Sequence, residues 1–593
     1  MIRIPLRPLA RILRAREQGE NPDVIERENI RRRHAEMQDK ARARAEGRIL
    51  VLGVFFVCVF SLIGVRMGAL AMSEAAEPLS AGSGAAIAAQ RVDIVDRKGR
   101  ILATNFDTFS LYAQPPLMVD PVAAAAGLVK VFPDLDEARL VKDFTGKRKF
   151  IWVKKRISPE QQQAVHDIGD PGLLFGPREM RLYPNGRLAA HILGGASFGK
   201  EGVHAAEVIG VAGVEKQFDT YLRDPANGAK PLQLSLDLTV QAAVERVLYG
   251  GMKLMNAKGA SAVLMNVHTG EVLAMVSLPD FDPNQRPRPP TEGDPSDSPL
   301  FNRAVQGVYE LGSVFKIFTA ALAMDLGLVN PLTMIDTRGP LRWGKFRIKD
   351  FRNYGNEMTV TKIIVKSSNI GSARLAQMIG PKRQEAFMDA MGMLERTPIE
   401  IVEAAGGKPL KPKVWSELSA MTISYGHGLS TSPVHLAAGY SVIANGGRYV
   451  SPTILKQTGT QYGPRIISEQ SAAQARVMLR EVVTDGTASF GEVPGYNVGG
   501  KTGTADKPKP GGGYYEGRVL STFASLFPAN DPKYVLIVSL DEPSVQSYGE
   551  LRRTAGWTAV PVAAEMIGRV APLLGLRPEG APPRDSGIVL TSQ

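Results

Sequence analysis

The sequence predicts an α+β protein attached to a membrane by one N-terminal helix, and three observations support that prediction. Residues 49–65 form an uncharged apolar run, as at the start of a membrane span. Strand-like runs bounded by turn residues recur from residue 91 onward. Between the early and the late strands, apolar residues after Ser313 repeat at helical spacing until Gly327. A chain of 593 residues is also too long for one core, so two or more domains are expected.

The first 72 positions predict a membrane anchor. Ile49–Val65 carries no charged side chain, and a helix continued to Met72 would be about 36 Å long, enough to cross a bilayer. A basic flank stays in the cytoplasm, so residues 1–48 should lie inside and everything after about residue 73 outside. The alternatives are a buried core helix and a cleaved signal peptide. The charged leader that precedes the apolar run is too long for a signal peptide.

The charge of the chain favours a polyanionic surface as a partner. Residues 1–48 carry 13 Lys/Arg against 8 Asp/Glu, a net of +5, which leaves +7 of the total +12 for the rest of the chain. That remainder is interpreted as a mild excess spread over a large surface. Nucleic acid is disfavoured because no basic-aromatic platform or zinc-finger spacing accompanies the charge, whereas a membrane or cell wall fits. Residues 23–48 are predicted to be a solvated helix or a disordered arm.

Composition also limits the chemistry of the chain. Cys58 is the one cysteine, so an intramolecular disulfide and a cysteine metal site are excluded. The histidines lack the spacing of metal ligands. The sequence therefore predicts no metal and no cofactor.

The part after the anchor divides into a linker, two domains and a tail. Residues 73–90 are rich in Ala, Ser and Gly and are predicted to be a linker, which opens a first domain that ends at residue 235. The second domain spans residues 236–570. Residues 571–593, with four prolines, are predicted to be a disordered tail. The expected elements are a turn at 96–100, a hairpin at 260–277, a loop at 285–299, helices at 361–366 and 370–378, and late strands at 496–505, 521–527 and 534–540.

Three short motifs in the second domain point to serine acyl transfer. They are S-x-x-K at Ser313 and Lys316, S-x-N at Ser367 and Asn369, and K-T-G-T at Lys501, Thr502, Gly503 and Thr504. Each motif alone has a structural explanation: a helix N-cap, a turn between helices, or a surface strand end. Together and in this order they predict a nucleophile, its base and an anion clamp.

The first motif supplies the reactive group. Ser313 is expected at the start of a buried helix, with Lys316 one turn further on the same face. Burial beside other cations disfavours the ammonium form, so Lys316 would be neutral enough to take the serine proton. The backbone N–H of Ser313 and the helix dipole would favour a developing oxyanion.

The other two motifs are expected to relay a proton and grip the substrate. The Ser367 hydroxyl can pass a proton to a leaving amine, and the Asn369 amide can hold a substrate peptide group and Lys316. Lys501 and Thr502 on an edge strand can bind a terminal carboxylate. Gly503 would let a substrate backbone approach the strand, and the Thr504 N–H would complete the oxyanion hole.

With these motifs in place, the chain resembles the class B penicillin-binding proteins over nearly its whole length. Segments of the first domain, at 91–100, 181–186 and 213–219, are similar to the family's pedestal motifs, and Asn302-Arg303-Ala304 also fits. Ser424–Ser430, followed by Ser432-Pro433, resembles the division-specific branch, the penicillin-binding protein 3 type. One departure is Leu311, where the family usually has a proline before Gly-Ser.

The resemblance implies a pedestal domain followed by a transpeptidase domain with a mainly antiparallel sheet between helices. It implies a D,D-transpeptidase in which Ser313 attacks the D-Ala–D-Ala bond of a peptidoglycan stem peptide, and it implies inhibition by β-lactams. Expected partners are a SEDS-type glycosyltransferase and other division proteins of the inner membrane, with the catalytic domain in the periplasm. No glycosyltransferase domain of class A type is expected, because the N-terminal module is too short.

Two other functions stay open on the sequence. A D,D-carboxypeptidase or a β-lactamase shares the three motifs and differs in using water to resolve the acyl-enzyme. The membrane anchor and the large first domain disfavour a β-lactamase. A non-catalytic division scaffold or a β-lactam sensor is the second alternative, although a sensor should have several membrane spans and a cytoplasmic effector domain.

Overall fold

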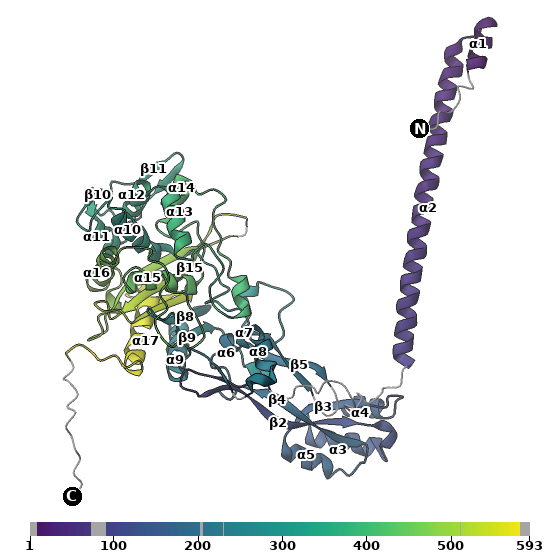
Figure 1. Ribbon diagram of the computed structural model, residues 1–593, viewed down its shortest axis with the longest axis horizontal. Helices are drawn as coiled ribbons and strands as arrows, with labels where there is room; N and C mark the ends of the chain where they lie inside the picture. The colour runs from purple at the N-terminus through teal and green to yellow at the C-terminus, as the bar shows by residue number, and fades with distance from the viewer. Residues whose placement is uncertain (1–8, 73–90, 202–205, 229, 510, 581–593) are drawn as a thin grey trace. The chain divides into compact units, whose positions relative to one another are not determined.

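The computed structural model describes residues 9–72, 91–201, 206–228, 230–509 and 511–580 (Figure 1). The linker predicted at residues 73–90 lies outside these ranges. The chain divides into two compact units. The smaller holds residues 1–79, 112–153 and 163–174, and the larger holds residues 80–111, 154–162 and 175–593.

The smaller unit contains the candidate membrane span. Its helices are α1 (Leu9–Glu17), α2 (Pro22–Met72), α3 (Pro121–Val131) and α4 (Glu137–Phe144). The charged arm and the apolar run form one continuous helix, α2, so the arm takes the helical one of its two predicted states. Among the described helices α2 alone is long and apolar enough to cross a bilayer, over Arg48–Met67. By length and composition, α2 is therefore consistent with the predicted anchor.

A sheet with the strand order β3-β2-β1-β7, in which β4 also pairs with β2, follows the anchor. Its strands are β1 (Ile94–Val95), β2 (Ile101–Ala113), β3 (Ile151–Ile157), β4 (Leu173–Leu182) and β7 (Leu232–Gln233). Further elements of this region are α5 (Pro159–His166), α6 (Ala190–Leu193), β5 (Gly195–Glu201), β6 (Ala206–Ala212), α7 (Gly213–Gln217) and α8 (Asp219–Arg223). The turn predicted at 96–100 joins β1 to β2, and its Asp96 carboxylate accepts hydrogen bonds from the backbone N–H groups of Lys98 and Arg100.

A buried ion network joins the three pedestal-like segments of the sequence. Glu215 accepts from Arg91 at 2.6 Å and from Arg181 at 2.7 Å, and all three side chains are almost fully buried. Asp219 accepts from Arg91 at 2.7 Å, and the Tyr183 hydroxyl donates to Glu215 at 3.3 Å. Because buried charges are tolerated only when they are paired, these segments depend on one another for stability.

We expect Glu215→Gln to destabilise this region by about 3–5 kcal/mol, because it leaves two buried guanidinium groups without their shared carboxylate. The measurement is the melting temperature of the purified chain by calorimetry. Glu565→Gln is the control, since it removes an exposed carboxylate paired with Arg569 and should cost less than about 1 kcal/mol. Equal melting temperatures for the two variants would contradict the expectation.

The rest of the larger unit is built on an antiparallel sheet of order β14-β15-β16-β8-β9. Its strands are β8 (Gly259–Asn266), β9 (Val272–Leu278), β14 (Gly499–Pro508), β15 (Tyr514–Phe527) and β16 (Tyr534–Asp541). The predicted hairpin at 260–277 and the three predicted late strands are confirmed. The hairpin occupies one edge of the sheet, and β14, which carries the K-T-G motif, occupies the other.

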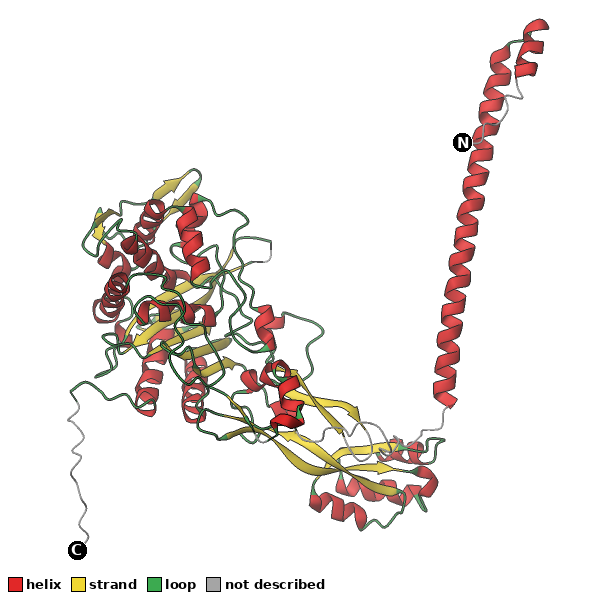
Figure 2. Cartoon of the chain, in the orientation of Figure 1, coloured by secondary structure: helices red, strands yellow, loops and turns green. Residues whose placement is uncertain are grey.

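Helices cover both faces of this sheet (Figures 1 and 2). α9 (Leu238–Leu254) and α17 (Ala559–Leu573) pack on one face. α15 (Pro433–Ala444) and α16 (Glu469–Asp485) pack on the other, with α10 (Lys316–Asp325) against α16. A further group of elements lies around α10: β10 (Met334–Asp336), β11 (Leu341–Trp343), β12 (Phe346–Ile348), β13 (Glu357–Thr359), α11 (Val360–Lys366), α12 (Asn369–Ile379), α13 (Pro381–Ala390) and α14 (Glu417–Ile423). A last short hairpin pairs β17 (Val545–Ser547) with β18 (Glu550–Arg552).

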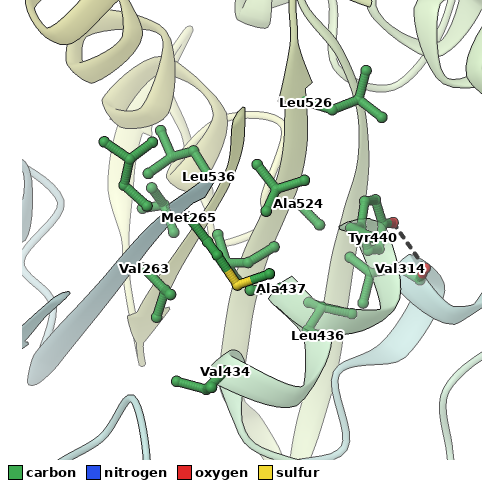
Figure 3. Packing of buried hydrophobic residues seen from close by; sticks show 14 of the residues in the cluster. Val263, Met265, Val314, Val434, Leu436, Ala437, Tyr440, Ala524, Leu526 and Leu536 are labelled. Atoms are coloured by element: carbon green, nitrogen blue, oxygen red, sulfur yellow. Dashed lines mark hydrogen bonds between the residues drawn. The ribbon is translucent and has the colours of Figure 1, made fainter. Parts of the chain in front are cut away.

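The core beneath α15 fixes the turn that carries Ser313. Every residue of α15 is buried, and it packs on side chains of the sheet such as Val263 and Met265 of β8 (Figure 3). Tyr440 of α15 has no exposed surface, and its hydroxyl donates to the carbonyl of Val314 at 2.9 Å. The apolar core therefore positions the peptide group next to Ser313.

The start of the predicted disordered tail is ordered. α17 continues to Leu573, and Ala571 is fully buried on it. Beyond the helix, the N–H of Glu579 donates to Gly495 at 2.7 Å, and its carboxylate accepts from Asn497 and Asn530. Proline content suggested disorder, but α17 runs through Pro572, because the burial of Val570 and Ala571 in the core outweighs the cost of a proline inside the helix. Residues 581–593 of that prediction lie outside the described residues.

Candidate active site

Ser313 lies at the start of a buried helix, as predicted. Gly312–Phe315 forms a 3₁₀ turn that leads directly into α10, and Gly312 has a left-handed φ of 63° that favours glycine. Lys316 is the first residue of α10 and is 1% exposed. Ser313 is partly exposed. The turn therefore presents the serine to solvent while it directs the lysine into the protein.

The S-x-N serine meets the lysine of the first motif. The Lys316 Nζ donates to the Ser367 carbonyl at 2.6 Å and to its hydroxyl at 3.0 Å. Ser367 ends α11 with a left-handed φ of 63°. Non-glycine residues adopt that conformation at a cost of about 1–3 kcal/mol, and such residues cluster at functional sites. The strained backbone turns both oxygens of Ser367 toward one amine.

The K-T-G lysine meets the same hydroxyl. The Lys501 Nζ donates to the Ser367 hydroxyl at 3.0 Å, and Lys501 has no exposed surface. One hydroxyl is thus shared by two buried lysines, one from α10 and one from β14. The structure therefore brings the S-x-x-K, S-x-N and K-T-G motifs together within hydrogen-bonding reach.

Burial of both amines alters their charge. Burial, and after it the charge of Lys501, lowers the pKa of Lys316 well below its usual value, while the Asp350 carboxylate acts in the opposite direction. Burial lowers the pKa of Lys501 to about 7. A neutral amine at Lys316 can accept a proton, and a charged one at Lys501 can attract an anion. The two lysines are thereby suited to different tasks.

Asn369 makes different contacts from those expected. Its side-chain amide donates to the carbonyl of Lys349 at 2.9 Å, and the hydrogen bonds of Lys316 go to Ser367 instead. Asp350 holds the start of α12, since it accepts from the Ser368 hydroxyl at 2.7 Å and from the Ile370 N–H at 3.0 Å. In this structure Asn369 and Asp350 fix the loop around Ser367.

The side chains of the K-T-G-T strand are also anchored. The hydroxyls of Thr502 and Thr487 lie 2.7 Å apart, and Thr502 is 8% exposed. The Thr504 hydroxyl accepts from the N–H of Ala555 at 3.0 Å. Because β14 is an edge strand paired with β15 alone, its outer backbone groups are available to an extended peptide.

Three glycines let the backbone around Ser313 pack closely. A Cβ on Gly503 would lie 2.2 Å from the carbonyl oxygen of Leu311, and a Cβ on Gly426 would lie 1.9 Å from that of Gly312. A Cβ on Gly312 would lie 2.9 Å from the carbonyl oxygen of Thr504. Gly503 therefore makes room for the nucleophile turn, a contact that the sequence did not predict. Leu311, the departure from the family pattern, lies buried at this contact.

We expect Gly503→Ala to lower the acylation rate about 100-fold, because the added methyl group must displace the turn that carries Ser313. The measurement is the second-order rate of covalent labelling by penicillin. Gly568→Ala is a matched control on α17, where the nearest atom to an added Cβ is a valine methyl group at 3.8 Å. Labelling of Gly503→Ala at the wild-type rate would show that the close contact is not needed.

Sequence reasoning missed a second group of side chains, around His427. Its ring lies 5.4 Å from that of Tyr425 and 5.9 Å from that of Tyr514. Glu310, three positions before Ser313, accepts from the Tyr514 hydroxyl at 2.9 Å. Burial lowers the pKa of His427; the Glu310 carboxylate opposes that shift, and the charge of Lys316 adds to it. The sequence offered one sign of this group, namely that Glu310 lies three positions before Ser313.

Metal ligation is not indicated in the described part of the chain. No group of three or more His, Cys, Asp or Glu side chains there is arranged to hold a metal ion. The groups that meet at Ser367 are the amines of Lys316 and Lys501 and the hydroxyl and backbone carbonyl of Ser367 itself. This set suits proton transfer and anion binding.

Comparison with known proteins places the chain in a family. Residues 260–566 match the penicillin-binding protein transpeptidase domain, and residues 86–233 match the penicillin-binding protein dimerisation domain. A probable peptidoglycan D,D-transpeptidase FtsI of Caulobacter vibrioides is 34% identical, over 92% of each chain. A probable peptidoglycan D,D-transpeptidase PenA of Neisseria gonorrhoeae is 30% identical, over 83% of this chain and 86% of the other.

A solved structure agrees with these relatives. Penicillin-binding protein 3 of Mycobacterium tuberculosis, in complex with aztreonam, superposes with a TM-score of 0.61 at 26% identity. The match covers 83% of this chain and 97% of the other. The fold, the two matched domains and the converging motifs agree: the chain belongs to the penicillin-binding proteins, as a class B member of the FtsI type.

Proposed function

We propose that this chain is a peptidoglycan D,D-transpeptidase that works through an acyl-enzyme on Ser313. The observation that carries the proposal is the Ser367 hydroxyl, which lies 3.0 Å from the amines of both Lys316 and Lys501. Three motifs far apart in sequence therefore form one proton-relay and anion-binding site. The relatives named as D,D-transpeptidases support the same reaction.

Acylation begins at Ser313. Neutral Lys316 takes the Ser313 proton while Oγ attacks the carbonyl carbon of the penultimate D-alanine of a stem peptide. The C–O bond forms and the C–N bond to the terminal D-alanine breaks. The proton passes from Lys316 through the Ser367 hydroxyl to the leaving amine. The lowered pKa of Lys316 supports the first step, and its bond to Ser367 supports the last.

The negative charges of the substrate carboxylate and of the oxyanion are stabilised by β14 and by the turn that leads into α10. Lys501 and the Thr502 hydroxyl hold the terminal carboxylate of the substrate. The backbone N–H groups of Ser313 and Thr504 form the oxyanion hole, and the substrate lies along the edge of β14 as an added strand. Asn369 keeps the Ser367 loop in place through the hydrogen bond from its amide to the Lys349 carbonyl.

Transfer completes the cycle. The amine of a second stem peptide attacks the ester carbonyl, a C–N bond forms, the C–O bond to Ser313 breaks, and the amine proton returns to Ser313 through Lys316. Every proton has a carrier among these side chains, so the cycle closes without a cofactor. β-Lactams enter as mimics of the D-Ala–D-Ala dipeptide and leave a slowly hydrolysed ester.

The rate at which bound penicillin is released tests this function. The full chain in detergent is labelled with fluorescent penicillin and then chased. A transpeptidase keeps the label for many minutes, whereas a hydrolase of the β-lactamase type loses it within seconds. Loss within seconds would overturn the proposal. No observation on the chain favours a hydrolase or a non-catalytic scaffold.

The cellular setting is also proposed. Residues 1–48 would be cytoplasmic, residues 49–72 the membrane anchor, residues 73–235 the pedestal and residues 236–570 the periplasmic transpeptidase domain. The basic flank of α2 supports this orientation in the inner membrane. The resemblance to the division-specific branch supports septal cross-linking, with a SEDS-type glycosyltransferase and other division proteins as partners.

A further inference from the structure

A polar pocket lies beside the loop that carries Ser367. Its volume is about 370 Å³, within the range of sites for small ligands. It is formed by the segment between β10 and β13 together with Ile370 of α12. The lining residues that matter here are Arg338, Lys349, Asp350, Arg352 and Ile370. The catalytic steps above do not use this pocket.

The segment that forms the pocket is strongly cationic. Residues 337–356 hold six Lys/Arg and one Asp, a net charge of +5. The sequence analysis took the net charge of +7 outside residues 1–48 as a mild excess spread over a large surface. That interpretation is wrong. Five of those seven net charges lie in this one segment, so its local field attracts anions.

Two of the pocket cations lack a charge partner in the part of the chain that the structure describes. Arg338 is bound by Asp336 at 2.9 Å, whereas Asp350 is engaged by the start of α12. Among the described residues, no carboxylate lies within 4.0 Å of the charged groups of Lys349 or Arg352. Both side chains are exposed at the pocket. Free cations at the wall of a cavity are suited to bind a carboxylate.

The pocket is coupled to the reacting groups through two short contacts. The carbonyl of Lys349 accepts from the Asn369 amide at 2.9 Å, and Asp350 accepts from the Ser368 hydroxyl at 2.7 Å. Ser368 directly follows Ser367, whose hydroxyl lies against both catalytic lysines. A ligand in the pocket therefore sits beside the group that exchanges protons with the leaving and the attacking amine.

We propose that this pocket binds a carboxylate of the second stem peptide, the amine donor, through Lys349 and Arg352. The inference rests on the proposed function and names where the acceptor is held. The carboxylate anchors the acceptor while its amine attacks the ester carbon on Ser313, the C–N bond forms and the C–O bond breaks. The amine proton passes through the Ser367 hydroxyl and Lys316 to the departing Ser313 oxygen. The carboxylate stays unchanged and only positions the amine.

The test separates acylation from transfer in the full-length chain. The variant is Lys349→Gln/Arg352→Gln, which keeps the Lys349 carbonyl that holds Asn369. A D-alanyl-D-alanine donor peptide is offered with amine acceptor peptides whose carboxylates are free or amidated. The control is Lys253→Gln/Lys456→Gln, two exposed cations of the same unit that also lack a carboxylate within 4.0 Å among the described residues.

We expect the variant to acylate with penicillin within twofold of the wild-type rate. Transfer to the free-carboxylate acceptor should fall about fivefold to tenfold through a higher KM, as expected for two exposed charge pairs. The wild-type preference for that acceptor over the amidated one should disappear, and the control variant should keep it. Slowed acylation, equal loss for both acceptors, or an effect seen only with a partner protein would each overturn the inference. If the wild type neither acylates nor transfers, the proposed function fails instead.

Discussion

Ser313→Ala is expected to abolish covalent labelling by penicillin, with a loss of about 10⁴-fold or more in the acylation rate. The hydroxyl is the atom that becomes bonded to the acyl group, and alanine offers no substitute for it. The fold should persist, because the turn is held by backbone packing and by the Tyr440 bond to Val314. Labelling with fluorescent penicillin, followed by gel electrophoresis, measures the effect.

Ser489→Ala is a suitable control for that experiment, since Ser489 is an exposed serine in another short 3₁₀ turn of the same unit. It should label at the wild-type rate, and both variants should melt at the wild-type temperature. Residual labelling of Ser313→Ala at the same molecular weight would identify a different nucleophile. Normal septation by a strain that carries only Ser313→Ala would make catalysis a secondary role.

Lys316→Ala is expected to slow acylation about 10³-fold, in the range for loss of a general base. The Lys316 amine is fully buried and donates to both oxygens of Ser367, so alanine removes the proton carrier and also releases the strained Ser367 loop. The measurement is the single-turnover rate of acylation. A loss below tenfold would show that the Ser313 proton has another acceptor.

Lys362→Ala provides the matched control for the lysine. Lys362 lies on the neighbouring helix α11 and makes an exposed ion pair with Asp485 at 2.9 Å. Removing such a pair should change stability by less than about 1 kcal/mol and leave the acylation rate unchanged. The contrast separates loss of the base from general loss of positive charge near the site.

The same two catalytic lysines predict a bell-shaped pH profile for acylation. The rate rises with pH as Lys316 loses its proton, at a pKa lowered by burial and by Lys501. It falls again as Lys501 loses the charge that binds the substrate carboxylate, near its pKa of about 7. Lys501→Arg should move the falling limb to higher pH, because a guanidinium keeps its proton. A falling limb that stays in place would assign it to another group.

The sequence predicted the parts of the site that depend on local pattern. The buried helix after Ser313, the helices on either side of Ser367 and the edge strand with Lys501 follow from periodicity and turn residues. The order of the three motifs was enough to infer that they meet. Their meeting on one hydroxyl, that of Ser367, was not predicted, because it depends on a left-handed backbone conformation.

Other features depend on contacts between distant segments and left no trace in local pattern. Gly503 was assigned to the substrate, yet it packs on the carbonyl of Leu311, which belongs to a distant part of the sequence. His427 carried no partner in its own segment, yet the fold places it between Tyr425 and Tyr514. The charge of residues 337–356 was visible in the sequence and was averaged away with the rest of the chain.

The contacts of Gly312, Gly426 and Gly503 limit how this enzyme could evolve tolerance to inhibitors. Strand, turn and loop touch backbone to backbone there, so a mutation that shifts one of them shifts the serine for drug and natural peptide alike. Escape without loss of growth must instead come from side chains that take no part in these backbone contacts. Selection with an inhibitor should therefore spare the three glycines.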